Sequence, residues 1–458
     1  MRPELLAFLV LPLAQACGGP TCGPGTHLEG DLCVPDEGDT DTDTDTDTDT
    51  DTDTGPEPPV GCPPLPASEG REVVIPSGDV SALTYAVNTA LAGDVILLED
   101  GTYHLDGAYL WIDDDRVTLR SQRGDRDAVV LDGGYLTTEI VNITANDVTV
   151  ADLTIQHSSL CGMHVQPANG YDIRDALIYN VVVLDTGEHA VKINQNGGFY
   201  TDDGTVACSR LEITDEGRPH IAQNHAGSCY TGGIDAHNTR GWHVYDNHIE
   251  GYWCPSGLSE HGIHFWSCNA DVVIERNTVV NAARGIGLGM HTAGEDERGF
   301  GAQYDCAEGA APDDFHGTVR NNVVFADDPD LFASGSGFDV GIELENTCLS
   351  RLLHNTVWST EAPYSSMSWR YAGTSAHIAN NLLSHNLRER DVAEVTAEGN
   401  LESAEAGQFV DAANGDLHLA AGAAAVDAGV VLSGESTVTY DIDGDRRDAL
   451  PDVGADEL

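Results

Sequence analysis

The middle of the chain alternates apolar and polar residues in short stretches that recur at roughly 20–30 residues. One type of stretch places Asn or Asp before branched apolar residues: ADLTIQ at 151, DALIYN at 175, DNHIEG at 246, RNTVVN at 276, NNVVFA at 321, HNTVWS at 354 and NNLLSH at 380. The second type begins with a small residue: GMHVQ at 162, AVKIN at 190, GIDAH at 233, GIHFW at 262, GIGLG at 285, GIELE at 341 and SMSWR at 366. Alternation with period two predicts strands, and the repeat predicts that they stack as coils of a parallel β-solenoid.

The region before these repeats has a different period. SALTYAVNTALAG from Ser81 places Leu83, Ala86, Val87, Ala90 and Leu91 on one helical face, and Gly93 follows as a stop. GDVILLEDGTYHL then reads as a strand, an Asp-Gly turn and a second strand. We therefore expect one helix at the entrance to the solenoid, and Asn residues that form ladders at the coil corners.

The N-terminal segment has the pattern of an export signal. An apolar run from Leu5 is too short to span a bilayer, and Ala14-Gln15-Ala16 fits a signal-peptidase site. The same residues before Cys17 also resemble a bacterial lipoprotein box, which leaves lipidation of Cys17 as an open alternative. We expect a signal peptide at 1–16, a Cys-rich module at 17–37, a disordered acidic linker at 38–61 and the solenoid at 62–458; the linker contains eight Asp-Thr repeats.

Charge narrows the classes of partner. The chain has 76 acidic and 21 basic residues and a net charge of −55, so no basic stripe is available for nucleic acid. Lys192 is the only lysine.

The chain has 11 cysteines, and setting Cys17 aside as a lipid site leaves an even number for disulfides. Cys22–Cys33, Cys208–Cys229 and Cys254–Cys268 are the candidate pairs. Metal binding by cysteine is not expected, because no close CxxC pair is present.

Two columns of outward side chains follow from stacking the second type of strand. The third position of each stretch gives His164, Lys192, Asp235, His264, Gly287, Glu343 and Ser368, and the fifth gives Gln166, Asn194, His237, Trp266, Gly289, Glu345 and Arg370. These columns contain most of the side-chain types that acid–base chemistry uses, together with an aromatic ring.

Lys192, Asp235, His237, His264 and Trp266 would form one patch if a single long coil separates Lys192 from Asp235. Glu343 would lie about 14 Å from Asp235, which is too far for a pair of glycosidase carboxylates. Asp235 with an acid from a loop, such as Glu260, remains open.

Elimination at a uronate requires a cation for the substrate carboxylate, a base and an acid. An adjacent Asp235 favours the charged form of Lys192, so His237 or His264 is the better base, and Lys192, Arg284 or Arg370 would neutralise the carboxylate. His164, Asn194, Trp266, Glu343 and Glu345 are the candidate substrate-binding residues. Zinc held by His261 and His264 with Asp235 is disfavoured, since an alternating strand does not place His261 and His264 on one face.

The body, 65–458, resembles the right-handed parallel β-helix proteins of the pectin-lyase-like superfamily, including chondroitinase-B-like and alginate-lyase-like proteins. EHAVKIN is similar to the lysine-bearing strand of alginate-lyase-like enzymes, and IDAHNTRGWHVYDNHIEG to their Arg-His-Gly strand, with His237 at the histidine. The positions of the arginine and the glycine hold Ala236 and Asn238. The C-terminal DIDGDRRDALPDVGADEL resembles a tail on bacterial surface β-helix proteins, and the Cys-rich module and Asp-Thr tract look like those of exported myxobacterial proteins.

These observations together predict an all-β fold, a right-handed parallel β-helix with an N-terminal capping helix. The expected function is that of an exported polysaccharide lyase acting on an acidic, uronate-containing glycan; the alternatives are a non-catalytic adhesin or glycan-binding solenoid, and a glycan epimerase or hydrolase. The expected partner is a polysaccharide, with no nucleic acid and membrane contact only through a lipid on Cys17, and a monomer is expected. Ca²⁺ is the one cofactor considered. The location follows as secreted, or as a lipoprotein of the outer membrane or cell surface.

Overall fold

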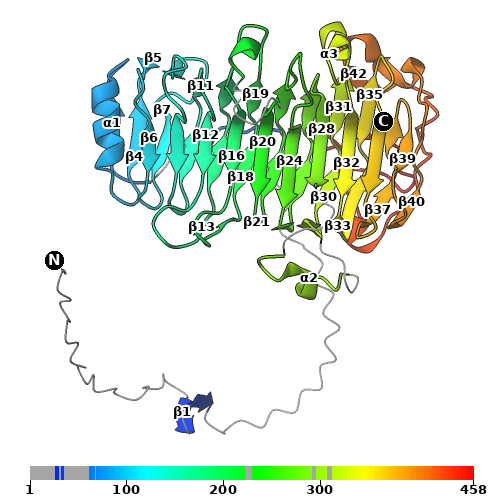
Figure 1. Ribbon diagram of the computed structural model, residues 1–458, viewed down its shortest axis with the longest axis horizontal. Coiled ribbons are helices and arrows are strands. Elements are labelled where there is room, and N and C mark those ends of the chain that lie inside the picture. Colours follow the sequence, from blue (N-terminus) through cyan, green and yellow to red (C-terminus); the bar gives the residue numbers. More distant parts are fainter. Residues whose placement is uncertain are drawn as a thin grey trace, which may run out of the picture. The chain divides into compact units, whose positions relative to one another are not determined.

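Most of the strands stack side by side in three parallel sheets (Figure 1). The computed structural model describes residues 26–29, 32–35, 61–67, 69–221, 229–290, 296–306 and 312–458. The chain divides into two units, Met1–Asp53 and Thr54–Leu458. In the first unit, β1 (Thr26–Glu29) and β2 (Leu32–Pro35) form an antiparallel pair.

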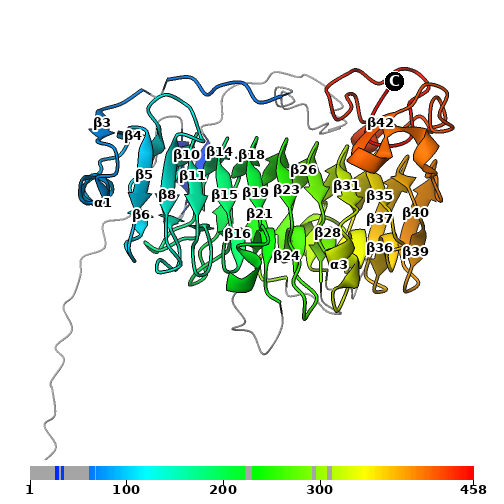
Figure 2. The same cartoon turned by 90° about the horizontal axis from the view of Figure 1, so that it is seen from above.

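The second unit is a right-handed parallel β-helix. Each coil runs from sheet I to sheet II to sheet III, as the strand orders show, and Figure 2 shows the coils from above. The twelve strands of sheet I are β3 (Glu72–Ile75), β4 (Val95–Leu98), β7 (Thr118–Ser121), β10 (Thr149–Ala151), β14 (Leu177–Tyr179), β18 (Thr205–Ala207), β22 (His243–Tyr245), β26 (Val273–Glu275), β30 (Thr318–Arg320), β34 (Ser350–Leu353), β37 (Ser375–Ala379) and β40 (Glu394–Glu398).

Sheets II and III have ten strands each. Sheet II contains β5 (Gly101–His104), β8 (Val129–Asp132), β11 (Thr154–Gln156), β15 (Val182–Leu184), β19 (Arg210–Glu212), β23 (His248–Glu250), β27 (Thr278–Val280), β31 (Val323–Ala326), β35 (Thr356–Ser359) and β38 (Leu382–Leu383). Sheet III contains β6 (Leu110–Ile112), β9 (Val141–Ile143), β12 (Met163–Val165), β16 (His189–Ile193), β20 (Gly232–His237), β24 (His261–Ser267), β28 (Arg284–Gly289), β32 (Val340–Glu345), β36 (Ser365–Arg370) and β39 (Leu387–Glu389).

A fourth sheet of two-residue strands turns the chain from sheet III back to sheet I. Its strands are β13 (Ile173–Arg174), β17 (Thr201–Asp202), β21 (Thr239–Arg240), β25 (Asn269–Ala270), β29 (Asp314–Phe315) and β33 (Thr347–Cys348). Near the C-terminus, β41 (Phe409–Asp411) and β42 (Asp416–Leu419) pair antiparallel.

The expected capping helix is present as α1 (Val80–Asn88), and Asp79 accepts a hydrogen bond from Ala82 N–H as its N-cap. The helix ends one turn earlier than the sequence predicts. As a result Leu83 and Val87 are buried, but Leu91, which lies beyond the helix, is 62% exposed. The two other α-helices in the described part of the chain are short, α2 (Phe300–Gln303) and α3 (Pro329–Ala333). None of these helices is both long and apolar enough to cross a bilayer.

An asparagine ladder runs up the corner between sheets I and II. Side-chain amides join successive coils at 2.8–3.0 Å through Asn247, Asn277, Asn322, Asn355, Asn381 and Asn400. The residue before each of the first five of these has a left-handed backbone, with φ between 51° and 56°. The predicted ladder is therefore confirmed, but the left-handed conformation falls on the residue before the ladder asparagine.

The outer faces of sheets I and II are partly covered by other segments of the chain. Leu65 packs on sheet I against Tyr179, Ala207 and Cys208. Phe409, Leu417, Leu419 and Val453 of the C-terminal segment pack on sheet II against Val323 and Phe325. The outer face of sheet III is the one that carries the polar columns.

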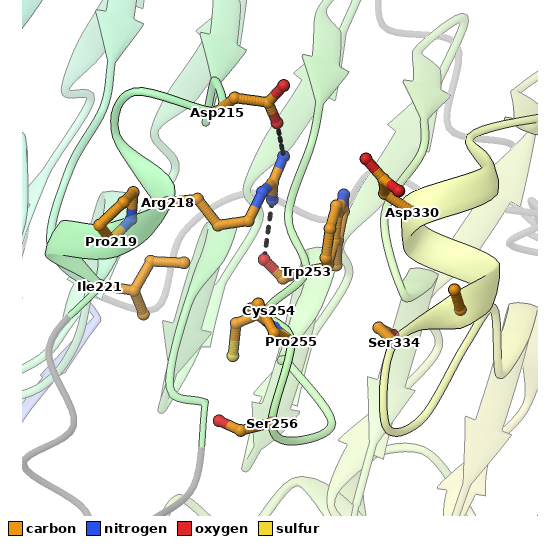
Figure 3. A pocket seen from close by; sticks show the side chains of 11 residues that line it. Asp215, Arg218, Pro219, Ile221, Trp253, Cys254, Pro255, Ser256, Asp330 and Ser334 are labelled. Carbon is orange, nitrogen blue, oxygen red and sulfur yellow. Dashed lines mark hydrogen bonds and ion pairs between the residues drawn. The ribbon is translucent and has the colours of Figure 1, made fainter.

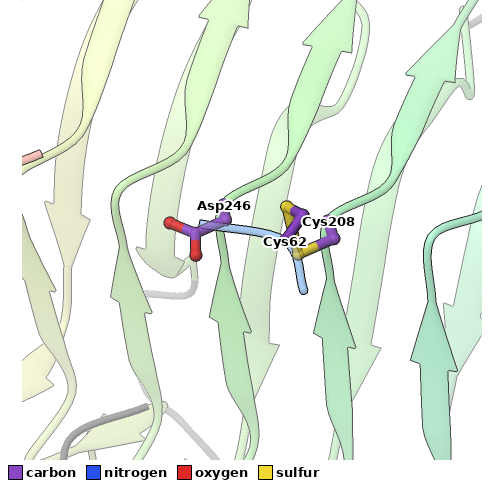
Figure 4. Close-up of side chains that lie close together, drawn as sticks. All are labelled: Cys62, Cys208 and Asp246. Atoms are coloured by element: carbon purple, nitrogen blue, oxygen red, sulfur yellow. A yellow bond between two sulfur atoms is a disulfide. The ribbon is translucent and has the colours of Figure 1, made fainter. Parts of the chain in front are cut away.

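Three disulfides occur among the described residues: Cys62–Cys208, Cys229–Cys254 and Cys306–Cys348. The predicted pairs Cys208–Cys229 and Cys254–Cys268 are therefore wrong, because each partner lies next to a different coil or loop. Cys161 and Cys268 are free and buried, so complete pairing is also wrong. Cys22 lies outside the described residues, so the pair Cys22–Cys33 stays a prediction. Figure 4 shows Asp246 beside the Cys62–Cys208 bond, whose sulfurs are not available to a metal.

Candidate functional site

The site is built on the outer face of sheet III, where β16, β20 and β24 lie side by side. Lys192 pairs with Asp235, and Asp235 pairs with His264. Val191 and Ile193 face the core, as do Ile234 and Ala236, so the alternation predicted for these strands is confirmed. A single coil separates Lys192 from Asp235, as the predicted patch requires.

The buried carboxylate of Asp235 is the centre of the patch. It forms an ion pair with Lys192 and accepts hydrogen bonds from Trp266 Nε1 at 2.7 Å and Tyr230 Oη at 3.1 Å. His189 Nε2 and His237 Nε2 each lie 3.3 Å from it. Burial alone would raise the pKa of Asp235, but the charge of Lys192 first, and then interactions with His189 and His237, outweigh burial and hold this pKa well below its ordinary value. Asp235 is therefore a permanent anion that orients its neighbours and cannot serve as the base.

Lys192, His237 and Tyr230 lie above this carboxylate. Lys192 Nζ donates to Tyr230 Oη at 3.0 Å and lies 2.8 Å from His237 Nε2, whose lone pair accepts from the ammonium. The side chains of Lys192 and His237 are 15% and 18% exposed, whereas that of Asp235 is 1% exposed. The outer layer can thus contact a ligand, and the inner layer holds it in place.

Two pKa shifts in this outer layer have the same cause, which is burial. Burial lowers the pKa of His237, and Asp235 opposes this only in part, so the imidazole stays neutral and basic near neutral pH. Burial also raises the pKa of Tyr230, and the charge of Asp235 adds to the effect. The Tyr230 hydroxyl therefore keeps its proton and can act as a donor.

The next coils carry a second, more deeply buried group of residues. The rings of His261 and His264 lie 4.2 Å apart, so both face outward, and the sequence argument that they cannot share a face is wrong. His264 Nδ1 lies 3.1 Å from Glu260, and His261 Nε2 lies 2.8 Å from Glu343. Burial would raise the pKa of Glu260, but the hydrogen bond and charge of His264 lower it to about 2. His264 is fully buried, so it is not the base that a substrate would meet.

The alternation breaks at one position of each strand, which explains why His189 was missed and why His261 was not placed on the outer face. Ala190 and Val191 both lie in the core, so the residue before them, His189, faces outward. A third outward column therefore precedes the two predicted ones. The recurring small residue at 162, 190, 233, 262, 285 and 341 is the sequence signal for it, since a Cβ at Gly162 or Gly233 would meet buried side chains.

Arg284 and Arg370 are not brought to Lys192. Arg284 belongs to the third column, where it donates to Ser259 O and lies 3.7 Å from Glu260 and from Glu343. Arg370 is on β36, four strands after β20, and lies 3.6 Å from Glu345. The patch around Lys192 therefore includes neither arginine, and their suggested role in neutralising a substrate carboxylate stays a prediction.

The remaining predicted residues lie at the two ends of the site. His164 pairs with Lys192 across β12 and β16, and its ring nitrogens contact Asn194 at 2.6 Å and Glu139 at 2.8 Å. Trp266 packs edge-on against His237, with ring centroids 4.1 Å apart. Glu343 and Glu345 both accept from Arg390, a residue that sequence reasoning missed.

Two cavities flank the outer face of sheet III. One of about 460 Å³ is lined by Tyr364, Arg370, Arg388, Glu389, Arg390 and Asp391. The other, of about 640 Å³, lies among the segments that join sheet II to sheet III; Figure 3 shows Arg218 beside Trp253, across from Asp330 of α3. Arg218 lies 3.7 Å from the Trp253 ring and donates to Gly251 O and Trp253 O, so its charge is already engaged.

The strands and their register define a right-handed parallel β-helix protein. A family model described as a right handed beta helix region matches residues 139–295. The crystal structure of pectate lyase Pel9A aligns with a TM-score of 0.56 at 16% identity, covering 85% of this chain and 97% of that chain. The predicted fold and its resemblance to pectin-lyase-like β-helix proteins are thereby confirmed.

Two further solved structures are similar at lower scores. An alginate lyase from Paenibacillus sp. str. FPU-7 aligns with a TM-score of 0.47 at 15% identity, covering 72% of this chain and 99% of that chain. A polygalacturonase from Erwinia carotovora ssp. carotovora aligns with a TM-score of 0.40 at 10% identity, covering 75% and 96%. No curated protein sequence matches the chain significantly.

Proposed function

We propose that the protein is a polysaccharide lyase that acts on a uronate-containing glycan along the outer face of sheet III. The observation that carries the proposal is the set of Lys192, His237 and Tyr230, held above the buried carboxylate of Asp235. The set contains a cation, with a neutral base and a protonated donor each within hydrogen-bond distance of it. Elimination beside a carboxylate needs these three roles.

The uronate carboxylate would bind the Lys192 ammonium, which frees the lone pair of His237 Nε2. That nitrogen then takes the proton on the carbon next to the carboxylate. The bond from the neighbouring carbon to the glycosidic oxygen breaks, its electrons stay on that oxygen, and a carbon–carbon double bond forms. The Tyr230 hydroxyl gives its proton to the leaving oxygen.

A cavity lined by Arg370, Arg388 and Arg390, together with Glu389 and Asp391, offers further cations to an acidic substrate. It lies four to five strands from Asp235 along sheet III, which is about 19–24 Å at the usual strand spacing. An extended anionic chain lying along the sheet would reach both places. We therefore assign the arginine cavity to a distant part of the same substrate.

The proposed mechanism does not use calcium, and calcium enters only as a variable of the activity assay. Calcium takes six to eight oxygen ligands. The carboxylates of Asp235, Glu343 and Glu345 already face Lys192, Arg390 and Arg370, which does not fit an oxygen cage. No step is routed through calcium. Export, with or without a lipid on Cys17, is likewise proposed, from the sequence pattern alone.

The test is the ultraviolet absorbance of unsaturated uronate products, with purified protein and a panel of alginate, pectate and chondroitin, with and without calcium. Wild-type protein should produce unsaturated ends from at least one polymer. Lys192→Met and His237→Gln should each lower the rate by about 10²–10⁴-fold. His220→Gln is the matched control, because His220 is exposed and lies outside the patch. A flat trace with folded protein on every uronate contradicts the proposal.

Glycan binding without turnover is the second candidate. The resemblance expects an arginine at position 236, but Ala236 is fully buried, so no cation stands there. If the absorbance test fails, retention of acidic polymers in affinity electrophoresis that Lys192→Met abolishes would establish the binding protein.

A further inference from the structure

A cysteine, a glutamate and a histidine meet under the edge of sheet III, beside the site, with which they share the histidine. Cys161 lies two residues before β12 and His189 is the first residue of β16, so the register of these two strands, in which Met163 pairs with Val191, places Cys161 next to His189; Glu188 precedes His189. One ligand atom from each of these side chains lies within 4.8 Å of the other two, and all three residues are buried.

The histidine of this cluster has no hydrogen-bond partner. Neither ring nitrogen of His189 makes a hydrogen bond within the described part of the chain, although the ring is fully buried. Nε2 faces the carboxylate of Asp235 at 3.3 Å. Nδ1, on the other side of the ring, is left without a partner. A buried polar nitrogen without a partner destabilises the folded state, so its retention calls for an explanation.

A metal ion would supply the missing partner. Thiolate, imidazole and carboxylate are the ligands that zinc takes in proteins, and a metal-bound histidine commonly turns its other nitrogen to a carboxylate. Here Asp235 is that carboxylate. We propose that Cys161, Glu188 and His189 bind a zinc ion, with His189 bound through Nδ1.

The other clusters of potential ligands fit a metal less well. Glu260, His261 and His264 are close together, but Arg284 lies 3.7 Å from Glu260 and would repel a cation. His418 and Asp443 are exposed and already contact each other at 2.9 Å. The Cys161 cluster combines a free thiol with an unpartnered, buried ring nitrogen.

No sequence motif predicts this site, because its ligands come from different coils. Zinc motifs are recognised by closely spaced residues, and Cys161 and His189 are 28 positions apart. The stacking of coils brings them together. The expectation that no cysteine binds metal rested on spacing alone.

Bound zinc would fix the orientation of the His189 ring and, through Nε2, position Asp235. This makes His189 a positioning residue for the patch of Lys192 and His237. The inference rests on the geometry of the cluster and not on lyase activity, so metal binding and turnover fail or succeed separately.

The experiment is metal binding by the purified, disulfide-bonded chain. Zinc content is measured by elemental analysis after dialysis, and the chelator-treated chain is titrated with Co²⁺. A thiolate ligand gives a cobalt charge-transfer band in the near ultraviolet that carboxylates on an acidic surface do not give. We expect one tightly bound equivalent and this band in the wild type.

Cys161→Ser should remove the band and weaken zinc binding at least about 10-fold. Cys268→Ser is the matched control, because Cys268 is also free and buried but directly follows β24, at the opposite end of the sheet III strands from Cys161, and it should change neither quantity. Circular dichroism checks that both variants fold. If Cys161→Ser does not fold, the wild-type spectrum decides alone. A wild type without the cobalt band, or a band that survives in Cys161→Ser, overturns the proposal.

Discussion

His237 and Asp235 show how one residue sets the protonation state of another. Asp235 is held ionised by its neighbours, whereas burial lowers the pKa of His237 despite the adjacent carboxylate. Desolvation of the imidazolium thus outweighs its attraction to Asp235. The neutral form of His237 is the form that the proposed elimination requires.

A pH profile follows from this shift. The base must be neutral, and a lowered pKa extends the neutral form to lower pH. The acid limb of log(kcat/KM) against pH should therefore lie below the ordinary histidine value of about 6.5. Initial rates from pH 4 to 9 on the best polymer of the panel measure it. An acid limb at or above pH 6.5 would show that His237 is not the base, or that its charge is favoured in the folded protein.

His354 allows a test on stability rather than activity. Its ring is buried at a coil corner, Nδ1 lies 3.1 Å from Asp452 O, and Asn380 Nδ2 donates to Nε2 at 2.9 Å. Burial lowers its pKa well below the usual value. The folded state therefore holds a neutral ring, while the unfolded state takes up a proton below about pH 6.5.

As the pH is lowered, the free energy of unfolding should decrease more steeply in the wild type than in His354→Asn. The difference builds up below about pH 6.5 and reaches at most about 2 kcal/mol at pH 5. Asn suits this position because φ is 52°, and Asn321 and Asn380 hold the same corner conformation in the neighbouring coils. Urea unfolding at pH 7, 6 and 5 gives the comparison. The exposed His104→Asn is the control, and parallel curves for wild type and His354→Asn would contradict the argument.

Among the elements, the strands of sheet III could be predicted and their edges could not. Alternation in GIDAH and GIHFW places Asp235 and His264 outward, because a strand has period two. The alternation is interrupted at Ala190 and at Gly262. A pattern of period two does not predict such an interruption, so His189 and His261 were not assigned to the outer face of the sheet. Tyr230 precedes β20 on a connection without any repeat, and its contact with Lys192 depends on tertiary packing alone.

The asparagine ladder is the element whose loss should be felt along the whole stack. Asn322 Nδ2 donates to Ile274 O at 2.9 Å and to Asn355 Oδ1 at 3.0 Å, and its own Oδ1 accepts from Asn277. Asn322→Ala leaves these buried partners unpaired, so we expect a loss of about 2–4 kcal/mol in the free energy of unfolding.

Asn400→Ala is the control for this effect. Asn400 lies at the end of the ladder and is only half-buried, so its loss should be nearer about 1 kcal/mol. Denaturant unfolding of the two variants measures both values. Equal losses would show that the ladder does not act cooperatively.

For the whole molecule, the order of strands could be predicted but the cross-links could not. Repeats define which strands stack, whereas a disulfide joins whichever sulfurs the loops bring together. Cys62 reaches Cys208 because residues 61–67 lie on sheet I, where Tyr179 Oη donates to Pro63 O at 2.6 Å. Nothing in the spacing of the cysteines indicates this contact, so the pairs proposed from adjacency failed.

Two predictions about the stability of the whole molecule concern these disulfides. Cys62–Cys208 closes 146 residues and Cys229–Cys254 closes 25. The chain entropy of the unfolded state then predicts losses of about 5 and about 3.5 kcal/mol when each pair is replaced by serines. Guanidinium unfolding of the two double variants should show the larger loss for Cys62→Ser with Cys208→Ser. The reverse order would mean that strain or residual structure dominates.

The Cys62–Cys208 bond also decides where a mechanical load enters the body. A pull on the chain ahead of Cys62 passes through this bond into the coil that contains β18, and bypasses residues 63–207. Helix α1 and the first coils, including the strand that bears Lys192, are then not on the loaded path. Without the bond, tension would unfold the solenoid starting from its capped end. With the bond, that end carries no load, and the force first reaches the stacked sheets at Cys208.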